Sequence, residues 1–253
     1  MVQPQIIRFD SNVKASPWPD LGSELFAGGP ARQSGHYWIG DPDGGYGAGV
    51  WQRDAHSSPF APYPVNALYL LLDGQAMVLE KGRVTRLRAG DAVIIPKGTP
   101  CTWRQTGALK AFFAKFDGPA ELKNPEPLVV QKIHRKISLL PTVPPSREVF
   151  LSAKPKQRDR TYFVDATQQF NAGVWESTPY ASKLRTQDCH EWVHLIQGSV
   201  TITDSHGNAQ QFNAADTLLI PRGTPYAWTS DMMVRKLYCK FQPGTRPAQS
   251  LMS

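Results

Sequence analysis

The sequence predicts an all-β protein made of two tandem copies of one antiparallel barrel. The tripeptide Gly49-Val50-Trp51 recurs 124 residues later as Gly173-Val174-Trp175. Short apolar or alternating runs surround both copies, with Gly and Pro turns between them and almost no helical periodicity. This pattern is typical of antiparallel sandwiches and closed barrels. A repeat of this length indicates a duplicated domain, because solenoid repeats are only about 20–50 residues long.

The repeat keeps its register over most of both copies. Gly74 and Gly198 are also 124 residues apart. One additional residue enters the second copy at the turn 204–208, and the offset of 125 that follows pairs Asp91 with Asp216. Both copies are therefore expected to have the same order of strands.

Besides the strand candidate 48–52, five segments of the first copy are predicted to be strands, because each is apolar or alternating and ends at turn residues. They are residues 68–72, 76–79, 84–87, 92–95 and 109–116. The second and third segments flank a short turn and are expected to form a hairpin.

The duplication also predicts the domain boundaries. We expect an N-terminal barrel over residues 1–120, a linker over 121–130 that prolines stiffen, and a C-terminal barrel over 131–253. The arm 1–23 is too rich in proline for a helix and is predicted to be irregular. The tail 242–253 is predicted to be loosely ordered.

Composition limits the partners. The chain of 253 residues has a formal net charge of +7 and a pI near 9.4, which favours anionic small molecules. The positive charge is spread thinly, so we expect no nucleic-acid partner. Three cysteines form no even framework, which indicates a reducing compartment.

The N-terminal residues include no apolar stretch of signal-peptide length, and no uncharged run is long enough to cross a bilayer. We therefore expect a soluble, cytoplasmic protein with no membrane partner.

The repeated residues resemble the cupin family, and more closely the two-domain cupins similar to ureidoglycine aminohydrolase and the ethanolamine-utilisation cupins. The pieces that carry the resemblance in the second copy are Gly173-Val174-Trp175-Glu176, Glu191 with Gly198 seven residues later, Ala214-Ala215-Asp216, and Ile220-Pro221-Arg222-Gly223-Thr224 before Trp228. The resemblance implies two tandem RmlC-like jelly-roll barrels and a homodimer. It says less about activity, since this fold hosts many chemistries.

The family's usual metal ligands are a His-x-His pair, a Glu a few residues later and a late His. The matching positions are Arg185, Gln187, Glu191 and Tyr226 in the second copy, and Ala61, Tyr63, Ala67 and Cys101 in the first. The resemblance therefore predicts no metal and no cofactor, and it leaves a candidate site in the second barrel alone.

Two histidines nearby do not replace the missing ligands. His190 and His194 are four residues apart, which is roughly 13 Å along a strand, and they alternate away from Glu191. One zinc ion, bound at about 2.1 Å, cannot reach both. We expect them on the outer face of the sheet or at a subunit interface, and we expect Cys101 and Cys189 to be small buried side chains.

The four polar positions form the candidate site. Arg185 and Gln187 are assigned to ligand binding, because a guanidinium holds a carboxylate bidentately and an amide both donates and accepts. Glu191 and Tyr226 are assigned to catalysis, as a group that takes or gives a proton and as a hydroxyl donor. The alternative is an internal salt bridge between Arg185 and Glu191 with no ligand.

Trp175 and Trp228 are candidate apolar walls of the ligand site. The same pair recurs as Trp51 and Trp103 in the copy that lacks polar partners, which favours packing as their main role.

Three functions remain open. The preferred hypothesis is a two-barrel cupin whose C-terminal barrel binds a small polar, anionic metabolite without metal, with catalysis undecided. The alternatives are a metal-dependent aminohydrolase resembling ureidoglycine aminohydrolase, in which an ion activates water, and a non-catalytic sensor or structural protein.

Overall fold

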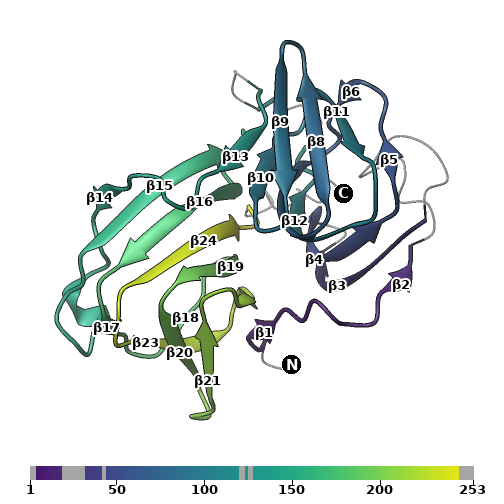
Figure 1. Ribbon diagram of the computed structural model, residues 1–253. Helices are drawn as coiled ribbons and strands as arrows, with labels where there is room; N and C mark the ends of the chain where they lie inside the picture. The colour runs from purple at the N-terminus through teal and green to yellow at the C-terminus, as the bar shows by residue number, and fades with distance from the viewer. Residues whose placement is uncertain (1–3, 19–31, 42–43, 120–122, 125–127, 245–253) are drawn as a thin grey trace, which may run out of the picture.

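The computed structural model describes residues 4–18, 32–41, 44–119, 123–124 and 128–244. Apart from one short 3-10 helix, η1 (Arg147–Val149), the regular structure in these ranges is β-strand. None of the helical structure in the described ranges is of a length and apolarity that would span a membrane. Figure 1 shows two barrels side by side. The chain passes between them twice, once between β1 (Ile7–Arg8) and β2 (Ser16–Pro17) and once between β13 (Gln131–Ile133) and β14 (Leu140–Thr142).

The first barrel contains two antiparallel sheets. Its strands are β2 (Ser16–Pro17), β3 (Gln33–Asp41), β4 (Tyr46–Arg53), β5 (His56–Ser57), β6 (Ala61–Pro62), β7 (Asn66–Asp73), β8 (Gln75–Glu80), β9 (Arg83–Arg88), β10 (Ala92–Ile95), β11 (Pro100–Gln105), β12 (Leu109–Phe116) and β13 (Gln131–Ile133). The large sheet has the order β13-β10-β7-β12-β4-β3-β2, and the small one β5-β11-β8-β9, with β6 also on β11.

The second barrel repeats this plan. Its strands are β1 (Ile7–Arg8), β14 (Leu140–Thr142), β15 (Gln157–Val164), β16 (Phe170–Ser177), β17 (Tyr180–Ala181), β18 (Arg185–Thr186), β19 (His190–Gln197), β20 (Ser199–Asp204), β21 (Ala209–Asn213), β22 (Thr217–Ile220), β23 (Pro225–Ser230) and β24 (Val234–Phe241). The large sheet has the order β1-β22-β19-β24-β16-β15-β14, and the small one β17-β23-β20-β21, with β18 also on β23.

The predicted strands of the first copy are confirmed. Each of the five segments lies within β7, β8, β9, β10 or β12, and β8 and β9 form the expected hairpin, closed at Glu80 and Arg83. The duplication extends to irregularities of the backbone. The pairing of β3 with β4 shifts register between Tyr37 and Ile39, and that of β15 with β16 shifts 124 residues later.

The buried side chains form three groups. One fills the first barrel around Trp51 and Trp103, and another fills the second around Trp228. The third lies between the two large sheets and takes residues from both barrels, among them Phe112 and Leu237. The central strands of the large sheets are therefore buried on both faces, which explains their nearly continuous apolar sequence.

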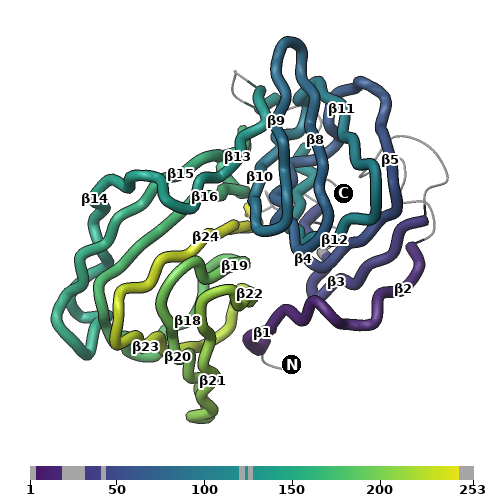
Figure 2. Tube along the Cα trace, in the orientation of Figure 1, coloured from purple at the N-terminus to yellow at the C-terminus, as the bar shows by residue number. Residues whose placement is uncertain are grey.

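Each barrel completes its large sheet with a strand from beyond its own repeat. In Figure 2 the N-terminal segment runs from β2 at the first barrel to β1 beside the second, where Ile7 pairs with Leu219. In return, Ile133 of β13 pairs with Ala92 of the first barrel. The arm 1–23, predicted to be irregular, thus contains two short strands in its described part, because the open sheet edge of β22 satisfies the backbone of β1. The domain boundaries at residues 120 and 131 remain a prediction.

One linker side chain contacts both barrels. Asn124 is buried, and its amide nitrogen donates to Asn66 Oδ1 at 2.7 Å and to the Lys97 carbonyl at 3.1 Å. Its oxygen accepts from the backbone N–H of Ala166 at 3.1 Å. The linker is thus fastened to the first barrel on one side and to the second on the other.

We expect Asn124→Ala to lower the free energy of unfolding by about 1–3 kcal/mol, because the buried partners of the amide lose their hydrogen bonds. Urea unfolding followed by tryptophan fluorescence measures this loss. The exposed Asn213→Ala is the control and should change stability by less than about 0.5 kcal/mol. Equal stability of the two variants would contradict a clamping role for Asn124.

Candidate functional site

A cavity of about 280 Å³ opens in the second barrel and collects most of the predicted residues. Five of the six line it, from four strands of both sheets: Trp175 on β16, Arg185 on β18, Glu191 on β19, and Tyr226 and Trp228 on β23. Gln187 does not line the cavity. It is buried and contacts two of the lining residues, as described next.

The polar side chains form one continuous chain of contacts from the mouth to the interior. Exposed Arg185 donates to the Tyr226 hydroxyl at 2.5 Å, and that hydroxyl donates to Gln187 Oε1 at 3.2 Å. Gln187 Nε2 donates to Glu191 Oε2 at 3.1 Å. Lys236 Nζ donates to Glu191 Oε1 at 2.9 Å. These five side chains are called the relay below.

Glu191 is ionised at neutral pH. Burial raises the pKa of its carboxyl group, but the charges of Lys236 and Lys240 outweigh burial and lower it to about 2. The carboxylate can accept a proton or a hydrogen bond, but it has no proton to give. Its ion pair is with Lys236, so the expected alternative of an Arg185–Glu191 salt bridge is not what the structure shows.

Tyr226 is suited to donating a hydrogen bond. Burial is the main cause of a raised pKa for its hydroxyl, partly offset by the charge of Arg185. The phenol therefore stays protonated at neutral pH. It is held in place by Arg185 on one side and Gln187 on the other.

Lys236 is a site residue that the sequence reasoning missed. Its counterpart in the first copy, at the offset of 125, is Ala111, and both face the first tryptophan of the pair, since Lys236 pairs with Trp175 as Ala111 does with Trp51. Aligning the two copies could have identified Lys236, because it places a charged side chain where the first copy has the methyl group of an alanine. Other polar residues of the cavity were also missed, among them Gln157, Asp159, Tyr238 and Lys240.

The tryptophan pair has nearly the same geometry in both barrels. Trp175 and Trp228 meet edge to face at 6.3 Å, as Trp51 and Trp103 do. In the second barrel the rings also flank a cation, with Lys236 Nζ 4.8 Å from the centroid of Trp175 and 5.2 Å from that of Trp228. The two rings of the second barrel therefore pack against each other and also make cation–π contacts with Lys236.

The indole N–H of Trp228 differs from its counterpart. Trp103 donates to Gln105 Oε1 at 2.8 Å, whereas the buried Trp228 N–H has no acceptor within the described ranges.

Aromatic side chains fill the equivalent space in the first barrel. The hydroxyls of Tyr63 and Tyr69 are 3.0 Å apart at the positions of Gln187 and Val193. Burial raises the pKa of both phenols. No charged relay occurs at these positions of the first copy.

The two histidines lie on the inter-barrel face. The ring of His190 stacks on Tyr46 of the first barrel at 5.5 Å. His194 is buried with Nδ1 2.9 Å from Thr217 Oγ1, and burial lowers its pKa to about 4, so it is neutral. We expected the outer face of the sheet or a subunit interface; His190 instead contacts the other barrel of the same chain.

Cys101 and Cys189 are buried as predicted. Burial, followed by a nearby glutamate in each case, raises the pKa of both thiols to about 12. Neither is a thiolate at neutral pH.

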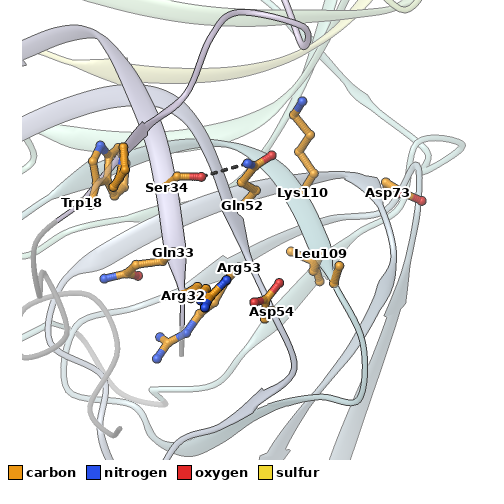
Figure 3. Close-up of a pocket in the computed structure, with 12 residues that line it drawn as sticks. Trp18, Arg32, Gln33, Ser34, Gln52, Arg53, Asp54, Asp73, Leu109 and Lys110 are labelled. Atoms are coloured by element: carbon orange, nitrogen blue, oxygen red, sulfur yellow. Dashed lines mark hydrogen bonds between the residues drawn. The ribbon is translucent and has the colours of Figure 1, made fainter. Parts of the chain in front are cut away.

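A larger cavity, of about 790 Å³, lies at the first barrel. Figure 3 shows its lining residues, which include residues of β2, β3, β4, β7 and β12. Two of its lining residues are hydrogen-bonded to each other, since Gln52 Nε2 donates to Ser34 Oγ at 2.8 Å. None of the four first-copy positions that correspond to the predicted site lines this cavity. Residues 19–31, which connect its lining residues Trp18 and Arg32, lie outside the described part.

Comparison with known proteins supports this architecture. Residues 164–238 match the family model described as a EutQ-like cupin domain. A solved protein of unknown function from Pseudomonas syringae pv. tomato str. DC3000 is 24% identical, with a TM-score of 0.79 over 94% of this chain and 100% of that one. The chain has the cupin fold. No curated protein matches its sequence.

Other solved cupins are more distant. Ylba from E. coli is 12% identical, with a TM-score of 0.54 over 85% of each chain. A variant of the salicylate 1,2-dioxygenase from Pseudoaminobacter salicylatoxidans, in complex with gentisate, is 10% identical, with a TM-score of 0.56 over 96% of this chain and 84% of that one. These likenesses concern the fold alone.

The relay does not fit the metal that the cupin fold commonly holds. Arg185 and protonated Lys236 have no lone pair to give, and the ammonium of Lys236 already occupies one oxygen of Glu191. Within the described ranges, no three His, Cys, Asp or Glu side chains are grouped to hold an ion. A divalent cation beside Glu191 would have to displace Lys236.

Proposed function

We propose that the C-terminal barrel binds a small anionic metabolite, through the relay and without a metal ion. The observation that carries the proposal is the relay itself, which joins a cavity in the second barrel to an exposed arginine at its mouth. The volume of about 280 Å³ is near the lower end of the range for small-molecule sites, about 300–1,000 Å³.

Charge supports an anionic ligand. Arg185, Lys236 and Lys240 line the cavity against Glu191 and Asp159, which leaves one positive charge in excess. Lys236 and Glu191 neutralise each other. Exposed Arg185 donates to the Tyr226 hydroxyl through one nitrogen and keeps its other N–H donors for a carboxylate.

The metal-dependent aminohydrolase is the weaker candidate, because the donor set does not suit a divalent ion. We expect elemental analysis of the untagged protein to give far less than one metal ion per chain. One equivalent of a transition metal in the wild-type protein, and none in Glu191→Gln, would favour the hydrolase instead.

A non-catalytic sensor would use the same cavity. The relay supplies groups for proton transfer, in Glu191 and Tyr226, but a binding protein needs only Arg185 and its neighbours. Chemical conversion of a bound ligand would indicate an enzyme, and binding without conversion would indicate a sensor.

We expect Arg185→Gln to weaken the binding of lactate, used as a small carboxylate probe, by about 10- to 100-fold, because a charged hydrogen bond contributes about 1.5–3 kcal/mol. Isothermal titration calorimetry measures the change. Arg222→Gln is the matched control, since this exposed arginine of the second barrel does not line the cavity. Equal affinity in both variants would remove Arg185 from the site.

The resemblance also leads us to propose a homodimer. Light scattering coupled to size-exclusion chromatography should give twice the mass of one chain, and a mass of one chain would refute it.

A further inference from the structure

Lys236 places a primary amine inside the cavity of the second barrel. Its residue is 8% exposed, and Nζ lies between Glu191 and the rings of Trp175 and Trp228. The neighbouring copy has Ala111 at this position. The amine is therefore present in the barrel that has the polar cavity. Because the first barrel folds with alanine at this position, the fold itself does not need a lysine there.

The residues around this amine include the groups that imine formation needs. Glu191, 2.9 Å from Nζ, can accept the proton that an ammonium must lose before it attacks a carbonyl. The Tyr226 hydroxyl, protonated at neutral pH, is connected to Glu191 through Gln187. Arg185 at the outer end of the relay suits a carboxylate.

We infer that Lys236 forms a Schiff base with a small 2-oxo carboxylate, whose carboxylate group Arg185 holds. The inference rests on the proposed function and names its ligand class. A carboxylate and a carbonyl are the groups that an arginine and an amine lining one cavity would bind, and the volume of about 280 Å³ restricts the ligand to a short one.

The step balances without a further reactant. Glu191 takes one proton from the Lys236 ammonium, and the nitrogen lone pair forms a C–N bond to the carbonyl carbon while the C=O π pair moves to oxygen. That oxygen takes the proton from Glu191 and a second proton from nitrogen, and it leaves as water when the C=N bond forms. The product is an iminium ion, so the positive charge beside Glu191 is kept.

The environment of Lys236 favours this chemistry. Burial lowers the pKa of its amine, and the charge of Glu191 opposes that shift only in part. A larger fraction of free amine is thus available than for a surface lysine. The two tryptophan rings limit access of water, which hydrolyses imines.

Trapping with borohydride tests the inference. Full-length protein is incubated with pyruvate and sodium borohydride, and the adduct is located by intact mass and peptide mapping. We expect one reduced adduct per chain, on Lys236. Lys236→Arg keeps a cation beside Glu191 but cannot form an imine, and it should reduce trapping by at least about tenfold. Lys132→Arg, on a strand of the first barrel, is the control and should trap as the wild type does.

The lactate probe separates this inference from the proposed function, because lactate has the carboxylate but no carbonyl. Lactate should compete with pyruvate and slow trapping in the wild-type protein, which needs no variant to fold. Lactate binding without any adduct on Lys236, or an adduct spread equally over other lysines, overturns the inference and leaves the anion site in place. If neither compound binds, both proposals fail.

Discussion

Lys236→Met is expected to lower the free energy of unfolding by about 3–5 kcal/mol at neutral pH, because it leaves the Glu191 carboxylate buried without its ion-pair partner. The side chains of the pair are 10% and 6% exposed, so water cannot replace the lost contact. Urea unfolding at pH 7 measures the loss. Arg185 lies at the mouth and is not expected to take the place of the ammonium.

A second substitution tests the cause. Lys236→Met combined with Glu191→Gln removes both charges while keeping similar volumes, and it should recover most of the lost stability, since no uncompensated charge remains. A single variant that loses less than about 1 kcal/mol, or a double variant no better than the single one, would contradict a buried ion pair.

Acid is expected to destabilise the protein through Glu191. The carboxyl group has a pKa of about 2 in the folded chain against a usual value of 4.5, so the folded state binds its proton less readily than the unfolded state. The stabilising contribution, about 3 kcal/mol, is fully present above pH 4.5 and is lost as the pH falls toward 2.

Urea unfolding at pH 6 and at pH 3 measures this effect. The wild type should lose about 2 kcal/mol more than Glu191→Gln over this range, because the variant has no carboxyl group to protonate there. Glu148→Gln removes an exposed carboxyl group and controls for general effects of acid. Equal losses in the wild type and Glu191→Gln would show that this carboxyl group titrates alike in both states.

The sequence was enough to predict the longer apolar strands of the first barrel and their repetition in the second, because a long duplication and alternating apolar runs report directly on buried faces. The exchange of β1 and β13 between the barrels was not predictable in this way. Strands of two or three residues, such as Ile7–Arg8 and Gln131–Ile133, are too short to show periodicity. Their pairing is decided by an open sheet edge far away in the sequence.

Five of the six predicted site residues line one cavity, since the resemblance to cupins fixed which strand positions face the interior. The ionic partner of Glu191 was missed because the contact is non-local. Glu191 lies opposite Lys240 in the strand pairing, yet its ion pair is with Lys236, four residues away on β24. Such a diagonal contact depends on side-chain conformations that a linear motif does not contain.

A crystal structure of the protein with lactate, with anomalous data collected above the absorption edges of the first-row transition metals, tests the central claim most directly. The account predicts carboxylate density against Arg185 in the second barrel and no anomalous peak beside Glu191. Lactate bound in the first barrel, or a metal peak at the place of the Lys236 ammonium, would contradict it.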